Sequence, residues 1–108
     1  MSKYKSQKVK VDGITFDSQK EAARYCELKL LLKAGKISNL NWQVPFELQP
    51  AYKKNGKGIR NIKYIADFTY TENGLMVVED TKGFKTKEYL LKKKMFEFKY
   101  TDLTFKEI

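Results

Sequence analysis

Two apolar segments separated by an Asn-Gly pair constrain the fold more than any other feature of the chain. The segments are residues 62–70 and 75–81, and Glu72-Asn73-Gly74 lies between them. Asn-Gly favours a tight two-residue turn, because both residues adopt a positive φ at little cost. The pattern therefore predicts a long β-hairpin in the second half of the sequence.

A helix is predicted on each side of this hairpin. The first covers residues 18–34 and ends at Gly35, and Ser18 with Glu21 three residues later forms a capping box. The second covers residues 86–100 and has a lysine-rich outer face. Its apolar side chains lie at helical spacing, namely Leu91, Met95 and Phe98, with Tyr89 and Phe96 beside them.

Shorter strand patterns precede the hairpin. Residues 8–11 and 14–16 flank Asp12-Gly13, which predicts a small ribbon with a tight turn. Residues 37–49 carry apolar side chains in strict alternation, which predicts a strand. Pro45 places that strand at an edge, a bend or a bulge, because proline has no N–H to donate to an inner ladder.

Together these elements predict one α/β (α+β) domain that covers residues 1–108. A final strand is predicted at residues 103–107, so the order is helix, strand, hairpin, helix, strand. That order favours a central mixed β-sheet with a helix packed on each side. A chain of 108 residues supports one modest hydrophobic core, and neither a repeat nor a linker divides it.

Composition excludes several kinds of chemistry. The chain has one cysteine, Cys26, and no histidine, so zinc sites and histidine-based nucleophilic triads are not expected. Acid–base and metal chemistry must then come from carboxylates, lysines or tyrosines, and oxygen ligands favour Mg2+ or Mn2+. No segment approaches the roughly 18 apolar residues that span a bilayer, and the start lacks a signal-peptide core. We therefore expect a cytoplasmic protein that does not contact a membrane.

Positive charge favours a polyanionic partner. The 22 Lys and Arg against 13 Asp and Glu give a formal charge of +9, which in so small a domain favours nucleic acid. Residues 53–58 have no apolar side chain and predict an exposed basic loop. The residues expected to contact DNA phosphates, in binding that weakens with salt, are Lys53, Lys54, Lys57, Arg60, Lys85, Lys87, Lys92 and Lys93. For residues 92–94, a merely solvated helix face is an equally open alternative.

Three polar side chains interrupt the apolar pattern of the hairpin: Asp67, Asp80 and Lys82. Residues two apart on a strand share a face, so Asp80 and Lys82 point the same way and Glu79 points to the other side. Asp67 lies on the preceding strand, where pairing brings it within reach of Asp80. Two neighbouring carboxylates repel unless a cation lies between them, so the pair predicts a divalent metal site. Taken singly, each of the three is also explained as a solvated surface group.

Glu21 is a further acidic candidate. On the first helix it falls in line with Tyr25, Leu28 and Leu32, so a carboxylate occupies the stripe that faces the core. Two explanations stay open. Glu21 completes the capping box with Ser18, or it extends to the metal site directly or through water.

These residues together resemble a known superfamily. The motif consists of Glu21, then Tyr64-Ile65-Ala66-Asp67-Phe68, then Val78-Glu79-Asp80-Thr81-Lys82-Gly83. It resembles the PD-(D/E)xK, or restriction-endonuclease-like, nuclease superfamily, and nearly the whole chain is similar to small phage and prophage proteins that share this core. Ala66 stands where that superfamily often has proline, and Asp80 stands where glutamate is commoner.

The resemblance implies a restriction-endonuclease-like core in which Glu21, Asp67 and Asp80 bind one or two Mg2+ ions. It also implies that Lys82 assists the in-line attack of water on a phosphodiester. We therefore predict a metal-dependent DNA endonuclease of phage replication or recombination, active in the bacterial cytoplasm.

Selectivity for branched, flap or junction DNA is expected, because the sequence contains no base-reading module. The alternatives are a nucleic-acid-binding phage protein that keeps the nuclease fold without catalysis, and a modulator of a host factor. Homodimerisation stays open, because coordinated junction cutting needs two active sites and flap cutting needs one.

Overall fold

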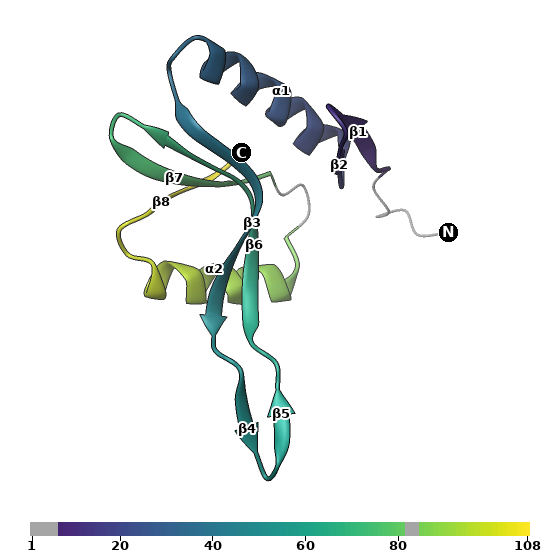
Figure 1. Cartoon of the computed structure of the whole chain (residues 1–108), viewed down its shortest axis with the longest axis vertical. Coiled ribbons are helices and arrows are strands. Elements are labelled where there is room, and N and C mark those ends of the chain that lie inside the picture. Colours follow the sequence, from purple (N-terminus) through teal and green to yellow (C-terminus); the bar gives the residue numbers. More distant parts are fainter. Residues whose placement is uncertain (1–6, 82–84) are drawn as a thin grey trace.

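The computed structural model describes residues 7–81 and 85–108 of the chain (Figure 1). Its elements follow one another as β1 (Val9–Val11), β2 (Ile14–Phe16), α1 (Gln19–Lys33), β3 (Ser38–Gln49), β4 (Tyr52–Lys54), β5 (Lys57–Ile59), β6 (Ile62–Glu72), β7 (Leu75–Asp80), α2 (Lys87–Lys99) and β8 (Thr104–Glu107). Both predicted helices, the two predicted hairpins and the predicted strands are therefore confirmed.

A mixed four-stranded sheet forms the centre of the fold. Its strand order is β3-β6-β7-β8, in which β3/β6 and β6/β7 are antiparallel and β7/β8 is parallel. The β6–β7 turn uses Asn73 and Gly74 at φ 52° and 78°, as the sequence predicts. Pro45 lies in the edge strand β3, where its missing N–H interrupts no inner ladder. The predicted α+β class with a central mixed sheet is confirmed.

The two helices pack against neighbouring side chains of β7 that point to opposite faces of the sheet. Val77 belongs to a core cluster with Tyr25 and Leu28 of α1, whereas Val78 belongs to a second cluster with Phe96 of α2. Because successive side chains of a strand point to opposite faces, α1 and α2 cover opposite faces of β7. Strand β7 therefore lies between the two halves of the core.

The buried face of α2 differs from the predicted one. Tyr89 and Phe96 are buried, whereas Leu91 is 58% exposed and Phe98 is 87% exposed. Phe96 contacts the rings of Phe46, Tyr64, Tyr100 and Phe105 with centroid distances of 5.1–5.7 Å. The helix is therefore rotated so that Tyr89 and Phe96 face the sheet, where Phe96 joins a cluster of rings and Phe98 points to solvent.

The predicted basic loop at residues 53–58 is wrong, because this segment forms the β4–β5 hairpin. Strand β4 pairs with β5 in an antiparallel ladder, and Asn55-Gly56 forms the turn at φ 52° and 79°. Figure 1 shows this hairpin projecting beyond α2 and beyond the ends of β3 and β6. An apolar pattern did not mark these strands, because all their residues are exposed and no face is buried.

Candidate active site at the end of the β6–β7 ladder

Asp67 lies where β6 and β7 stop pairing. The last residue pair of that ladder is Phe68 with Glu79. Beyond it, Thr81 donates both its backbone N–H and its hydroxyl to Oδ2 of Asp67, each at 2.8 Å. The Asp67 side chain thus takes over the role of a strand carbonyl and holds the chain after β7 beside β6.

Asp80 is fully buried on the α2 side of the sheet, at 0% exposure. The hydroxyl of Tyr64 donates a short hydrogen bond to Oδ2 of Asp80. Burial raises the pKa of Tyr64 most, and this hydrogen bond and the charges of Asp80 and Asp67 raise it further. Burial is also the main reason that the pKa of Tyr89 is raised, and both aspartates contribute there too. Because Asp67 is bonded to Thr81, the residue that follows Asp80, both carboxylates lie at the same end of the β6–β7 ladder.

Glu79 points to the opposite face from Asp80, as strand alternation predicts, and it has a partner there. Arg24 of α1 donates from Nε to Oε1 at 2.6 Å and from the guanidinium NH2 to Oε2 at 2.9 Å. The Tyr70 hydroxyl donates to Oε2 as well. The Glu79 hydrogen bond is also the largest cause that raises the pKa of Arg24. A carboxylate engaged in this way holds α1 against the sheet and leaves Asp80 as the better ligand candidate.

Glu21 lies on the buried stripe of α1 that the sequence predicts. It is 4% exposed and lies one turn before Tyr25, which is 2% exposed. Its backbone N–H donates to Oγ of Ser18 at 3.1 Å, which confirms the Ser18 half of the capping box. Both explanations for Glu21 therefore stay open.

Lys82, the predicted catalytic lysine, lies outside the described residues. Among the residues that are described, no three Asp, Glu or Cys side chains gather closely enough to hold a metal ion. Glu21, Asp67 and Asp80 therefore do not form a three-carboxylate cage within residues 7–81 and 85–108. The positions of Asp67 and Asp80 permit a metal site with two protein carboxylates.

Gln43 is a residue of this region that sequence reasoning missed. In the β3–β6 register it falls opposite Asp67, between the pairs Trp42–Phe68 and Val44–Ala66. Its φ of 53° is left-handed, which is unusual inside a strand and bends β3 at this point. The Gln43 amide donates to the carbonyl of Thr15 at 3.0 Å and so fixes the bend to the β1–β2 ribbon. No pattern of hydrophobicity marks such a position.

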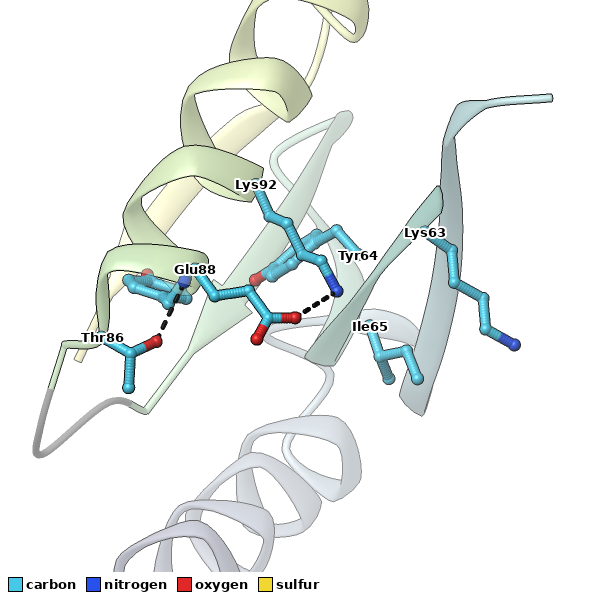
Figure 2. A pocket seen from close by; sticks show the side chains of 7 residues that line it. Lys63, Tyr64, Ile65, Thr86, Glu88 and Lys92 are labelled. Atoms are coloured by element: carbon cyan, nitrogen blue, oxygen red, sulfur yellow. Dashed lines mark hydrogen bonds and ion pairs between the residues drawn. The ribbon is translucent and has the colours of Figure 1, made fainter. Parts of the chain in front are cut away.

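A cavity of about 320 Å3 opens next to Tyr64 (Figure 2). It lies between β6 and the start of α2, and Tyr64, whose hydroxyl holds Asp80, forms part of its wall. Glu88 and Lys92 form an ion pair at 3.1 Å across one side. The lining residues are Lys63, Tyr64, Ile65, Thr86, Glu88, Tyr89 and Lys92.

Comparison with known proteins identifies the family. A family model described as "Protein of unknown function (DUF1064)" matches residues 1–108. The chain belongs to this family. No curated protein and no solved structure matches it significantly.

In this DUF1064 protein, the eight basic residues that were expected to contact phosphates divide into two groups. Lys85 and Lys93 pair with Glu107 at 3.3 and 3.1 Å, and Lys92 pairs with Glu88. The second group, which makes no ion pair with any residue of the described ranges, consists of Lys53, Lys54, Lys57, Arg60 and Lys87. The cations of the β4–β5 hairpin are therefore the more available for phosphates, and most of those near α2 are already neutralised.

The helices bear on the expectation that the protein does not contact a membrane. In the part of the chain that is described, no helix is long and apolar enough to cross a bilayer.

Proposed function

We propose that this DUF1064 protein is a metal-dependent nuclease that hydrolyses phosphodiester bonds in DNA. The supporting observation is the placement of Asp67 and Asp80 on adjacent strands at one end of the β6–β7 ladder, where Asp67 accepts two hydrogen bonds from Thr81, the residue that follows Asp80. Two like charges at one place are costly unless a cation or a hydrogen-bond network compensates them. A bound Mg2+ or Mn2+ provides that compensation.

The donor set fits a hard divalent cation. Mg2+ is usually held by one or two carboxylates, and waters and substrate phosphates complete its shell. Asp67 uses only Oδ2 in its bonds to Thr81, so within residues 7–81 and 85–108 its Oδ1 accepts no hydrogen bond. When bound, the ion would polarise the phosphate and lower the pKa of coordinated water.

The residues around the pair have supporting roles in this proposal. Thr81 fixes the orientation of the Asp67 carboxylate, and Tyr64 fixes that of Asp80. Burial keeps the Tyr64 hydroxyl protonated, so it remains a donor at alkaline pH. Glu21 contributes a further acidic group from α1, and Lys82 supplies positive charge for the phosphate, a role that rests on the sequence motif alone.

The cavity beside Tyr64 suits substrates with an unpaired or displaced nucleotide. Lys63, which is exposed, lies at the cavity and supplies a positive charge for the phosphate of such a nucleotide, and the nearly buried Tyr64 and Tyr89 line the cavity beside it. We therefore propose that the protein selects its substrate by DNA structure, such as flaps, branches and junctions, rather than by base sequence. From the resemblance to phage proteins, we propose that this activity serves DNA replication or recombination in the bacterial cytoplasm.

A second candidate function is nucleic-acid binding without cleavage. The observation that favours it is that Asp80 is fully buried and that its Oδ2 already accepts a hydrogen bond from Tyr64. In that case Asp67 and Asp80 have a structural role at the end of the sheet, and the exposed basic residues alone bind the nucleic acid.

Cleavage assays separate the two candidates. Labelled duplex, single-stranded, flap and four-way-junction DNA would be incubated with the protein in Mg2+ or Mn2+, alongside Asp67→Asn, Asp80→Asn and Lys82→Gln. Glu97→Gln serves as a matched control, because Glu97 is an exposed acid on α2. We expect cleavage by wild type and control and none by the other three. DNA binding without cleavage in every metal would leave the second candidate, and cleavage by Asp80→Asn would place the active site elsewhere.

A further inference from the structure

The β4–β5 hairpin is a paired two-stranded arm rather than a loop. We call residues 52–59 the β4–β5 arm. The β3–β6 ladder ends at the pair Gln49–Ile62, and the arm continues it with Tyr52–Ile59, Lys53–Gly58 and Lys54–Lys57. A tight Asn55-Gly56 turn closes the tip. The arm is therefore a narrow two-stranded ribbon that extends away from the body of the protein (Figure 1).

The arm and its base carry positive charge without compensation. The segment of residues 50–63 contains no acidic residue. Its basic residues are Lys53, Lys54, Lys57, Arg60 and Lys63, and none of them forms an ion pair with a described residue. All five are exposed. Three lysines in or near α2 differ, because Lys85 and Lys93 pair with Glu107 and Lys92 pairs with Glu88.

Two of these cations face each other at the tip. Lys54 and Lys57 are direct cross-strand partners, so their side chains share a face of the ribbon. Like charges in that position destabilise a hairpin. Behind them on the same face lies the pair Tyr52–Ile59, which is 47% and 37% exposed. The Tyr52–Ile59 pair stabilises the ribbon, whereas the two lysines at the tip do not, and both features suit an anionic partner with a partly apolar interior.

We propose that the β4–β5 arm inserts into the major groove of B-form duplex DNA, where Lys54 and Lys57 contact phosphates on the groove edges. The major groove is about 12 Å wide and admits a two-stranded ribbon, whereas that of A-form RNA is too narrow. The inference takes its nucleic-acid partner from the proposed function, but it does not require cleavage.

The position of the arm also sets how much duplex the protein covers. The extended chain from Lys57 to Asp67 spans at most about 35 Å. One turn of B-form DNA is about 34 Å long. The groove held by the arm therefore lies within about one helical turn of the carboxylate pair, and a substrate needs a duplex segment of up to that length beside the cleaved bond.

Binding assays in a metal chelator test the arm without any cleavage. Fluorescence anisotropy would give the affinities for a DNA duplex of about two helical turns, an RNA duplex of the same length and a single strand. The tip variant is Lys54→Gln/Lys57→Gln. The matched control is Lys33→Gln/Lys36→Gln, which removes the same charge from exposed lysines at the far end of α1. Thermal unfolding of each variant would verify folding.

The tip variant should bind duplex DNA at least about tenfold more weakly than wild type near 0.1 M salt, and the control should not. The slope of log affinity against log salt should become less steep by about 1.8, because each phosphate that a lysine no longer neutralises changes it by about 0.9. RNA duplex and single strand should lose much less affinity. An equal loss on all three nucleic acids, or no loss on duplex DNA, would overturn groove insertion.

The two proposals fail in different ways. If duplex binding depends on the tip but no substrate is cut, the arm inference stands and the nuclease proposal falls. If DNA is cut but the tip variant binds and cuts like wild type, the nuclease proposal stands and the arm inference falls.

Discussion

Thr81 donates two hydrogen bonds to a single oxygen of Asp67, one from its backbone N–H and one from its hydroxyl, both at 2.8 Å. The contact joins two strands just past the last residue pair of their ladder. It thereby fixes the chain that follows β7 and leads to Lys82, and it orients the Asp67 carboxylate. The Asp67 side chain therefore both accepts these structural hydrogen bonds and serves as a proposed metal ligand.

Replacement of Thr81 by valine tests the structural part of this relationship. Thr81→Val keeps the backbone donor and the shape but removes the hydroxyl, so it should lower the free energy of unfolding by about 1.5–3 kcal/mol, as for hydrogen bonds to charged groups. Urea denaturation measures this change. Thr104→Val, at an exposed residue of β8, should have little effect. Equal stabilities of the two variants would show that the hydroxyl contributes nothing.

Asp67→Asn tests the proposed ligand. The substitution preserves the size of the side chain but removes its charge, so Mn2+ affinity should fall by at least the roughly 10-fold to 100-fold loss that follows removal of a ligand's hydrogen-bond partner. Isothermal titration with Mn2+ gives the affinity without reference to cleavage. Glu97→Gln should retain wild-type affinity. Unchanged Mn2+ binding by Asp67→Asn would remove Asp67 from the site.

The Arg24–Glu79 pair should be essential for stability. Arg24→Met leaves a carboxylate of 0% exposure without its cation, which should cost about 3 kcal/mol. Adding Glu79→Gln removes the stranded charge, so the double variant should be more stable than Arg24→Met alone. Chemical denaturation of the two single variants and the double variant completes a cycle. A loss below about 1 kcal/mol in Arg24→Met would class the pair with ordinary surface ion pairs.

Acid stability should depend on Glu107. The Tyr89 hydroxyl, followed by Lys93 and Lys85, lowers the pKa of Glu107 from 4.5 to about 2. A lowered carboxyl pKa gives stability that is fully present above 4.5 and is lost as the pH falls toward about 2. Tyr89→Phe should raise the pKa of Glu107 toward 4.5 and shift acid unfolding to higher pH.

A carboxyl-detected NMR titration measures that pKa directly. Tyr52→Phe is the control, because Tyr52 is exposed on the β4–β5 arm and lies apart from Glu107 in the fold. Its substitution should leave the Glu107 titration unchanged. A Glu107 pKa that is the same in Tyr89→Phe and wild type would assign the shift to the two lysines.

Local sequence signals predicted the elements that are stabilised by contacts between residues close in sequence. The capping box at Ser18 and the turn at Asn73-Gly74 are satisfied within a few residues, so they specified α1 and the β6–β7 hairpin directly. Strand periodicity also placed Glu79 and Asp80 on opposite faces, because that alternation follows from backbone geometry alone. The order of elements then sufficed for the mixed sheet.

Only the tertiary structure decided the remaining relationships. The bend at Gln43 depends on a bond to Thr15, and the pairing of Lys93 with Glu107 depends on α2 packing beside β8. The β4–β5 arm had no buried face to give it a pattern, although its Asn-Gly turn was present in the sequence. Propensity and periodicity act over a few residues, whereas burial and charge pairing depend on neighbours that are distant in sequence and become adjacent only in the folded chain.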